Sequence, residues 1–446
     1  MTNDRRSPKS DAFFGLNAGE SRMSVFFGLD FGTSNSALSV NINGEVSLLD
    51  IDEDNHAGLT LKSILYFDEY SKGIYTGEKA VEKYIENDAE GRYMQSIKSF
   101  LPDQMFDRTE IHRKLYQIDD LVALVLKQIK NRGEKIIDKS VDDVVLGRPV
   151  VFDENPERDQ LAETRLISGA KKAGFKNIRL MPEPIAAALS YEKSLNHGEE
   201  KKILVGDFGG GTSDFTVMRI KKGRESLTDR RKDILSVGGV PVGGNTFDSK
   251  IMWEKLAKFY GKGLKIQSYM SENHFEMPTR IIGKLKRWHL IPQLRAYKIQ
   301  ESIKQLKYRS DNHKYIQNLE NLIDDNYGYM LFRQIEAAKC ELSAAMQTGI
   351  DLNEYLNQTI HITRETFEGL IDSEVKSINK CVEETLKKAE LSSDKIDIVF
   401  LTGGSSFIPC IKELFNKKFG PGKVKHSDAF TSVAYGLGIS GVSMAS

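Results

Sequence analysis

A short pattern of a strand, an acid and a glycine turn occurs twice in the chain, 177 residues apart. Residues 30–34 (DFGTS) follow the apolar run 25–29, and residues 207–213 (DFGGGTS) follow the apolar run 203–206. Each copy predicts a buried strand that ends in an aspartate, then a tight turn with hydroxyl side chains, then a second strand. Glycine lets a backbone approach a ligand closely, and consecutive amides in such a turn form a pocket for anions. Two such turns facing each other predict a site for a polyphosphate, with two carboxylates left to organise a metal ion.

The composition is that of a globular chain with more than one lobe. The 446 residues are enough for two or more hydrophobic cores, and 40% of them are hydrophobic while 28% are charged. Lysine plus arginine and aspartate plus glutamate both number 63. The basic excess typical of nucleic-acid binders is therefore missing, and we expect no nucleic-acid partner. No apolar run in the sequence approaches the roughly 18 residues that a membrane span needs, so we expect no membrane partner.

The N-terminal stretch and the cysteines favour an intracellular location. Residues 1–24 are polar and charged, with no apolar core behind their arginine pair, which favours a disordered extension over a signal peptide. Cys340, Cys381 and Cys410 are far apart, odd in number and without metal-type spacing. This pattern favours a reducing compartment, and we expect a cytoplasmic protein.

The repeated unit divides the chain into two α/β lobes, because a pattern that recurs once over this distance indicates domain duplication. We expect the first lobe over residues 25–202, with a subdomain at about 50–140, and the second lobe over residues 203–446. Residues from about 250 to 335 are helix-rich and basic, and they predict a helical subdomain inserted into the second lobe. The basic run at 284–288 predicts either a solvated helix face or a contact with an acidic partner.

Beyond the two turns, a series of motifs resembles a known family. The turns are similar to the two phosphate loops of the actin-like ATPase superfamily, and the wider pattern resembles the nucleotide-binding half of the 70-kilodalton heat-shock chaperones, the DnaK family. The resemblance covers residues 25–441, and the length is similar to that of the short YegD-type members without a peptide-binding domain. The motifs follow in the family's order: residues 30–35, 182–188, 207–214 and 243–248, then Glu336, Lys339 and Ser343, then residues 403–409 and 433–436.

The resemblance implies a fold and a ligand. The fold is α/β, with duplicated actin-like (ribonuclease H-like) domains in two lobes around a nucleotide cleft and a helical inserted subdomain. The ligand is ATP or ADP with Mg²⁺, and K⁺ is a further candidate. By their positions in the family's motifs, the following residues are expected to contact the nucleotide: Gly32, Thr33, Ser34, Asn35, Gly209, Gly210, Gly211, Thr212, Ser213, Gly243, Gly244, Glu336, Lys339, Ser343, Gly403, Gly404, Ser405 and Phe407.

The resemblance also gives a catalytic role to Lys98, Glu183, Thr212 and Asp207. Lys98 occupies the place of a family lysine that reaches the γ-phosphate, where a cation neutralises charge on the transferring group. Glu183 stands between two prolines at a predicted helix start and matches a family glutamate near the attacking water. The residues alone favour a solvated surface lysine at position 98, and they also allow Glu183 to be a simple helix-start acid that interacts favourably with the helix dipole.

Three aspartates are expected at the cation. Asp30 and Asp207 end the two predicted strands, and Asp214 follows Asp207 by seven residues and matches a further acid of the family's site. Mg²⁺ loses its water reluctantly and is typically held by one or two carboxylates plus phosphate oxygens. We therefore expect these aspartates to hold the ion mostly through water.

The predicted adenosine side departs from the family. Glu336, Lys339 and Ser343 are spaced to lie on one face of a helix, which the family turns toward ribose and adenine, although a solvated stripe has the same spacing. Many members clamp adenine between two arginines, and Cys340 and Phe407 fill those places here. Phe407 can still stack on a base, whereas Cys340 cannot supply a cation.

These expectations describe an ATP-binding and slowly hydrolysing protein similar to heat shock protein 70, consisting of the nucleotide-binding domain only and related to the chaperones. Its partners would be ATP and an unidentified protein client or cochaperone. Three alternatives stay open. Cys340 and Phe407 point to a nucleotide-sensing module with little hydrolysis. A small-molecule kinase of the same superfamily would need a further catalytic acid, and a filament-forming actin relative would need a polymer interface; the sequence singles out neither.

Overall fold

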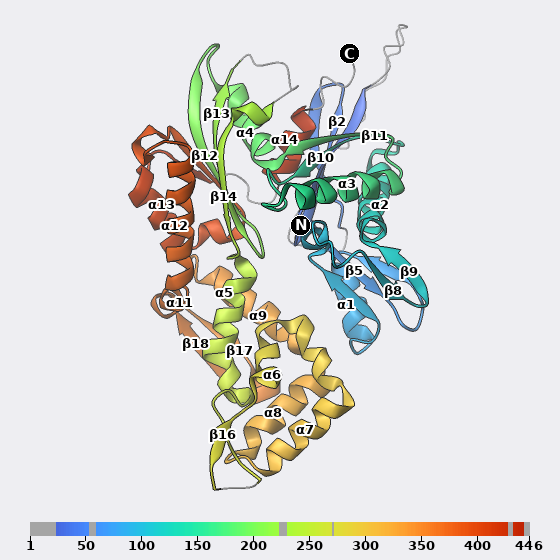
Figure 1. Ribbon diagram of the computed structural model, residues 1–446, viewed down its shortest axis with the longest axis vertical. Coiled ribbons are helices and arrows are strands. Elements are labelled where there is room, and N and C mark those ends of the chain that lie inside the picture. Colours follow the sequence, from blue (N-terminus) through green and yellow to red (C-terminus); the bar gives the residue numbers. More distant parts are fainter. Residues whose placement is uncertain (1–23, 53–58, 223–229, 270–271, 427–430, 441–446) are drawn as a thin grey trace, which may run out of the picture.

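The computed structural model describes residues 24–52, 59–222, 230–269, 272–426 and 431–440. Within them the chain forms two α/β lobes, each built on one large sheet, and a mainly helical unit lies at the lower end of the second lobe (Figure 1). The extension predicted over residues 1–24 lies outside the described residues, except for Ser24.

The main strands of the first large sheet are β1 (Val25–Phe31), β2 (Asn35–Ile42), β3 (Glu45–Leu49), β10 (Asp143–Arg148) and β11 (Asn177–Pro182). A sixth, two-residue strand, β4 (Leu61–Lys62), also pairs with β2. The strand order is β11-β10-β1-β2-β3. The pairs β1–β2 and β2–β3 are antiparallel, whereas β1–β10 and β10–β11 are parallel. The β2–β3 turn has φ angles of 54° at Asn43 and 96° at Gly44, as a tight hairpin with an Asn-Gly pair requires.

The second large sheet consists of β12 (Glu200–Phe208), β13 (Ser213–Lys221), β14 (Ile234–Val240), β19 (Ile398–Thr402) and β20 (Val424–His426). Its order, β14-β13-β12-β19-β20, reproduces the first sheet strand for strand. The two hairpin pairs are again antiparallel and the two crossover pairs parallel. The duplicated two-lobe fold expected from the repeated turn is therefore confirmed.

The helices repeat as well, each preceding or following the equivalent strand of its lobe. The pairs are α2 (Ile118–Ile137) with α12 (Asp372–Lys388), α3 (Pro156–Lys172) with α13 (Pro409–Phe419), and α4 (Glu183–Ser194) with α14 (Ser432–Ser440).

The ends of α3 show why the sequence forms a helix there. The Asn155 side chain accepts hydrogen bonds from the amides of Glu157, at 2.9 Å, and Arg158, at 3.3 Å, and Pro156 occupies the first turn. Gly174 follows the helix with a φ of 100°. These are the signals of a capped start and a glycine stop.

The helices α4 and α14 pack closely against each other between the two lobes. A Cβ atom at Gly436 of α14 would lie 1.9 Å from the Ala186 carbonyl oxygen of α4. The same helix is fixed to the first sheet, because Ser39 donates a hydrogen bond to the Ala434 carbonyl at 2.6 Å and Asn41 donates to that of Gly438 at 2.9 Å. The last helix of the second repeat therefore holds the first sheet in place against the second lobe.

Each lobe carries an insertion at the same point of the repeat, between its third strand and the helix that follows. The first insertion contains β4 (Leu61–Lys62), β5 (Ile64–Phe67), β6 (Ile74–Thr76), α1 (Glu78–Glu86), β7 (Arg92–Gln95), the 3₁₀ turn Ile97–Phe100, β8 (Arg108–Ile111) and β9 (Lys114–Gln117). The second contains α5 (Gly244–Ile251), β15 (Lys265–Gln267), β16 (His274–Glu276), α6 (Thr279–Ile282), α7 (Tyr297–Tyr308), α8 (His313–Asp324), α9 (Gly328–Glu341), β17 (Gln347–Asp351), α10 (Asn353–Leu356), β18 (Thr359–Thr363) and α11 (Arg364–Leu370).

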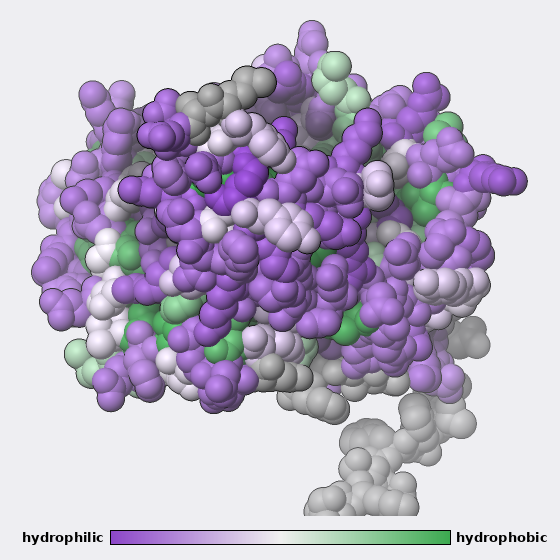
Figure 2. All heavy atoms as spheres, turned by 90° about the horizontal axis from the view of Figure 1, so that it is seen from below, coloured by the Kyte–Doolittle hydropathy of each residue, from purple (hydrophilic) through white to green (hydrophobic). Residues whose placement is uncertain are grey.

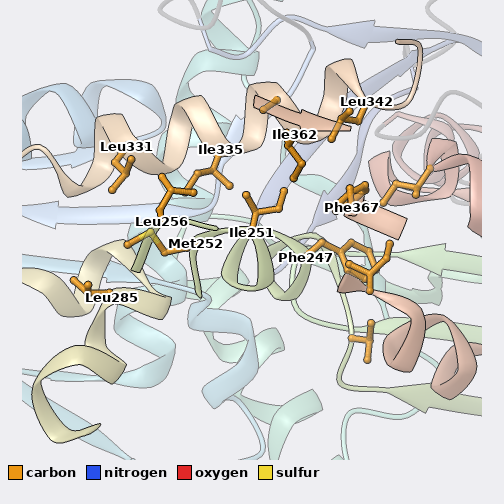
Figure 3. Packing of buried hydrophobic residues seen from close by; sticks show 14 of the residues in the cluster. Phe247, Ile251, Met252, Leu256, Leu285, Leu331, Ile335, Leu342, Ile362 and Phe367 are labelled. Atoms are coloured by element: carbon orange, nitrogen blue, oxygen red, sulfur yellow. The ribbon is translucent and has the colours of Figure 1, made fainter. Parts of the chain in front are cut away.

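Buried apolar side chains fix α9 against α5 (Figure 3). Ile335 and Leu331 project from α9 toward Ile251 of α5 and Leu256 of the π-helical turn Met252–Leu256 that continues it. All four side chains are fully buried. This packing sets the position of α9 relative to the chain that begins at Gly244.

Aromatic side chains join the two insertions. The Trp288 ring centroid lies 4.8 Å from that of Tyr93 and 6.0 Å from that of Tyr84, both of the first insertion, and 4.9 Å from that of Tyr329 in α9. We call these four residues the aromatic clasp. Lys62 of the first insertion donates a hydrogen bond to the Tyr329 hydroxyl at 3.1 Å. The clasp therefore holds the far ends of the two lobes together.

The basic run at 284–288 is split between solvent and the clasp. Lys286 and Arg287 are exposed, while Trp288 is half-buried.

Figure 2 shows the lower end of the molecule, where hydrophilic residues cover most of the face. Among the described residues, no helix combines the length and the apolar character needed to cross a bilayer.

Replacing Gly436 by alanine tests the α4–α14 contact. The added methyl group meets the Ala186 backbone, which cannot move aside as a flexible side chain would. We expect Gly436→Ala to lower the free energy of unfolding by about 1–3 kcal/mol. The measurement is chemical denaturation followed by circular dichroism.

The matched control is Gly369→Ala in α11, where a Cβ atom meets nothing within 4 Å. This variant should leave the stability unchanged or raise it by up to about 1 kcal/mol. Equal stability of the two variants would contradict the close helix contact.

Candidate functional site

The two glycine turns have the same length and register. Phe31 of β1 pairs with Ser36 of β2, so that residues 32–35 form the first turn. Phe208 of β12 pairs with Ser213 of β13, so that residues 209–212 form the second. The turns are therefore structurally equivalent, position for position.

The two turns approach each other closely, and the chain just before α5 approaches the backbone of the second turn. A Cβ atom at Gly210 would lie 2.2 Å from the Ser34 hydroxyl of the other lobe. A Cβ atom at Gly243, just before α5, would lie 2.6 Å from the carbonyl oxygens of Gly209 and Gly210. The Asn245 amide donates a hydrogen bond to the Gly210 carbonyl at 2.8 Å. The two phosphate-type turns and the start of α5 thus form one structural unit.

A cavity of about 330 Å³, which we call the front cavity, lies between the two lobes at this point. Residues of both turns line it, together with five charged side chains from outside the turns. The predicted site residues that it brings together are Asp30, Gly32, Thr33, Ser34, Asn35, Lys98, Glu183, Asp207, Gly209, Gly210, Gly211, Thr212, Asp214 and Gly403.

Lys98 and Glu183 form a buried ion pair in this cavity. The Lys98 ammonium lies 2.7 Å from Glu183 Oε1, and the lysine is only 8% exposed. Burial lowers the pKa of Lys98, but the Glu183 and Asp30 carboxylates outweigh it, so that the pKa is raised. The lysine stays charged at neutral pH, and it is not the solvated surface residue that spacing alone allowed.

The pKa values of the three aspartates are all raised, and desolvation is the main cause at each. Burial, and then the Glu183 carboxylate, raise the pKa of Asp30 to about 8, although Lys98 opposes the shift. Desolvation between the lobes and then Asp207 raise the pKa of Asp214 to about 6, although Asp214 is still reached by solvent in the cavity. The pKa of Asp207 is raised by burial, against a 2.7 Å hydrogen bond donated by Thr402. Among the described residues, no three acidic, histidine or cysteine side chains lie close enough together to ligate a metal directly. The three carboxylates therefore fit Mg²⁺ as an ion that keeps much of its water, with phosphate oxygens as further ligands.

A second group of predicted residues meets beside the front cavity. A Cβ atom at Gly244 would lie 3.5 Å from the Lys339 ammonium and 3.4 Å from the Ser405 hydroxyl. Lys339 is itself buried in an ion pair with Asp248, with Nζ 2.9 Å from Oδ1. Glu336 is exposed on the same helix. This part of α9 therefore faces the start of α5 and the turn after β19.

The expected helical position of Ser343 is wrong. The helix α9 ends at Glu341, and the Ser343 amide instead closes a turn by donating to the Cys340 carbonyl at 3.0 Å. The chain has to turn here because β17 begins at Gln347 and runs back as a hairpin with β18. Ser343 thus lies beyond the helical face of Glu336 and Lys339.

Two predicted hydroxyl donors have partners within the protein. The Ser213 hydroxyl is fully buried and donates to the Val242 carbonyl at 2.7 Å, so it is not available to a ligand. The Thr212 hydroxyl lies at the cavity and donates to Asp214 Oδ2 at 2.9 Å.

The turn after β19 passes close to the second glycine turn. Gly403 has a φ of 84°, and a Cβ atom there would lie 2.1 Å from the Phe208 carbonyl oxygen. Gly404 begins a 3₁₀ turn that ends at Phe407, whose side chain is 46% exposed. Cys340, at the other expected base contact, is also exposed.

Two residues of the site were missed from the sequence. Thr402 is the parallel register partner of Asp207 and fixes its carboxylate. Its place at a strand end just before two glycines was a usable signal, because parallel strand ends meet at one sheet edge. Asp248 lies within a motif that was recognised, but nothing in the sequence linked it to Lys339.

A family model described as Hsp70 protein matches residues 26–277 and 305–444 of the chain. The chain belongs to the Hsp70 family. The match includes both glycine turns and the segment of Glu336 and Lys339. Together with the duplicated sheets it shows the actin-like two-lobe fold and an Hsp70-like nucleotide-binding protein. Trp288 of the aromatic clasp lies in the unmatched stretch of this Hsp70 chain.

Replacing Asp214 by asparagine tests whether the ionised carboxylate at this position destabilises the ligand-free protein. Because the pKa of Asp214 is raised in the folded state, to about 6, its ionisation costs stability as the pH rises from about 4 to 7. Asn cannot ionise and keeps the Thr212 hydrogen bond. We expect a Tm higher than wild type by about 1–3 °C at pH 7.5 and unchanged at pH 4.

Differential scanning calorimetry at the two pH values measures this difference. Asp50→Asn, at an exposed aspartate after β3, is the control and should have no effect at either pH. A lower Tm for Asp214→Asn at pH 7.5 would show that the carboxylate charge is stabilising instead.

Proposed function

We propose that this Hsp70-family chain binds ATP with Mg²⁺ between its two glycine turns and hydrolyses it slowly. The observation that carries the proposal is the front cavity, in which both turns, three aspartates and the Lys98–Glu183 pair face one space of about 330 Å³. The backbone amides of the turns would hold the phosphates, as consecutive amides in glycine turns do.

The cation would be held by Asp30 and Asp207, with Asp214 as a further acid. Bound Mg²⁺ bridges phosphate oxygens and neutralises charge that develops during phosphoryl transfer. Burial, and after it the charge of neighbouring acids, raises their pKa values, and a divalent ion would oppose both effects because it favours the ionised carboxylates. K⁺ is a further candidate for the same negative region.

Lys98 and Glu183 would act on the terminal phosphate and the attacking water. Lys98 is charged and buried at the cavity wall, where a cation stabilises a transferring phosphoryl group most strongly. Glu183 lies at the start of α4 and would orient the water or accept its proton. Thr212 and Asp207 would complete the contacts from the second turn.

The adenosine would lie against α9 and the turn after β19. Glu336, Lys339 and the glycines at 403–404 would face the sugar, and Phe407 would stack on the base. Because Lys339 is already paired with Asp248 and Cys340 supplies no cation, base binding would rest mainly on stacking. This supports a second candidate function, a nucleotide sensor with little hydrolysis.

We also infer a protein partner and a cytoplasmic location. Hsp70 proteins generally act with clients or cochaperones, and this chain would signal to such a partner through lobe closure. The γ-phosphate would contact both turns at once, so that its loss would change how the lobes are held together. The cytoplasmic location rests on the sequence alone.

Single-turnover ATP hydrolysis by the wild type and by Lys98→Ala distinguishes an ATP-hydrolysing enzyme from a nucleotide sensor. Removing the cation should slow release of inorganic phosphate from bound ATP by about 100-fold, because one preorganised charge at a transition state contributes on that scale. ATP affinity, measured by calorimetry, should change much less. Lys127→Ala, at an exposed lysine of α2, is the control and should hydrolyse ATP as the wild type does.

If wild type and Lys98→Ala released phosphate equally slowly, the chain would be a sensor. Transfer of phosphate to a sugar or acid, without turnover in water, would instead make it a small-molecule kinase.

A further inference from the structure

Positive charge is concentrated in the second insertion. Residues 255–314 contain 14 lysines and arginines but only four aspartates and glutamates, whereas the two classes are equal, at 63 each, over the whole chain. The expectation of no nucleic-acid partner rested on that overall balance, which hides the uneven distribution. Residues 278–304 of this segment also lie outside the Hsp70 match, so family membership assigns them no role.

The helix α7 lies in this segment, at the lower end of the molecule (Figure 1), and exposes two tyrosines. Tyr297 and Tyr308 are 79% and 81% exposed. The two side chains are three helical turns apart, which puts them on one face of the helix at a separation of roughly 16 Å. Lys304 lies between them on the same face and is exposed. The opposite face is fixed in the core by the buried Ile303 and Leu306.

Further exposed aromatic rings lie beside the end of α7. The Gln267 amide of β15 donates a hydrogen bond at 2.9 Å to the carbonyl of Arg309, the residue just after the helix. The Arg309 side chain stacks over the Tyr269 ring, with 3.7 Å between the guanidinium carbon and the ring centroid. Tyr269 is 71% exposed, and Phe275 of β16 is also exposed. One basic unit therefore carries four exposed aromatic rings, two on the helix and two on the hairpin that meets its end.

The lysines near these rings have little negative charge around them. Lys298 on α7 and Lys265 on β15 are exposed, and neither pairs with a carboxylate among the residues that the structure describes. Lys304 lies 3.4 Å from Glu301, and both side chains of this pair are exposed. Such a pair compensates charge only weakly.

We propose that the α7 surface, the exposed face of α7 together with Tyr269 and Arg309 at its end, binds single-stranded nucleic acid. The lysines would hold phosphates, and unpaired bases would stack on the tyrosines and on the guanidinium plane. Stacking of this kind accepts every base, because each base has a π face. An acidic protein would meet the same cations, but the exposed rings favour a ligand that itself carries flat faces. This end of the molecule is mainly hydrophilic (Figure 2), which suits a polyanion better than an apolar partner.

Fluorescence anisotropy with a labelled, uridine-only RNA of about 12 nucleotides tests the proposal. We expect the full chain, without ATP, to bind this RNA. Its affinity should fall at least about tenfold when NaCl rises from about 50 to 150 mM, because each phosphate contact releases counterions. An RNA duplex of the same length should bind at least about fivefold more weakly, since its bases are already stacked on one another. Because no ATP is present, the result is independent of the proposed nucleotide site.

Two sets of variants place the RNA on the α7 surface. Tyr297→Ala and Tyr308→Ala should each weaken binding by at least about fivefold through lost stacking. The matched control is Tyr70→Ala, at a tyrosine of the first insertion that is 70% exposed, and it should bind as the wild type does. Lys298→Gln should reduce the slope of log affinity against log salt concentration by about 0.7. Its control, Lys412→Gln at an exposed lysine of α13, should leave that slope unchanged.

The proposal is overturned if the RNA does not bind at the lower salt concentration, or if both tyrosine variants bind as tightly as Tyr70→Ala. It is also overturned if polyglutamate of equal charge binds as tightly as the RNA, because the surface would then suit an acidic protein. All of the substituted side chains are exposed, so each variant should keep the wild-type Tm, which calorimetry checks.

Discussion

The structure depends on the close approach of the second glycine turn to Ser34 of the other lobe. A Cβ atom at Gly210 would come within 2.2 Å of the Ser34 hydroxyl, so a side chain there would displace that serine side chain. That contact brings two strand ends from different lobes to one space. The acids at those ends, Asp30 and Asp207, thereby line one cavity, in which burial raises the pKa of both.

Two other contacts keep the turns in this position. At one end, α4 and α14 touch where Gly436 meets the Ala186 carbonyl, and α14 is fixed to the first sheet. At the other end, the aromatic clasp joins the insertions through Trp288. A two-lobed protein held at both ends can change the spacing of its turns only if one of these contacts gives way. A change in the spacing of the turns, such as one caused by a bound phosphate, would therefore also disturb the contacts at the far ends of the lobes.

Local chemistry made the fold and the phosphate side of the site predictable. Repeated strand, acid and glycine patterns depend on neighbours in sequence, and both turns formed as expected. Contacts between distant residues could not be read in this way. The pairing of Lys339 with Asp248 and the packing of Trp288 on Tyr93 depend on how the second insertion folds back. Ser343 left its helix because the chain turns into a hairpin, which overrides its spacing.

The central claim is that one triphosphate is held from both lobes at once. Calorimetric titration with ATP and Mg²⁺ tests it most directly when wild type is compared with Gly32→Ala and Gly210→Ala, one variant in each lobe. The account predicts one ATP per wild-type chain and a loss of affinity of at least about tenfold in each variant. Wild-type affinity in one variant alongside lost binding in the other would contradict it, because the nucleotide would then depend on a single turn.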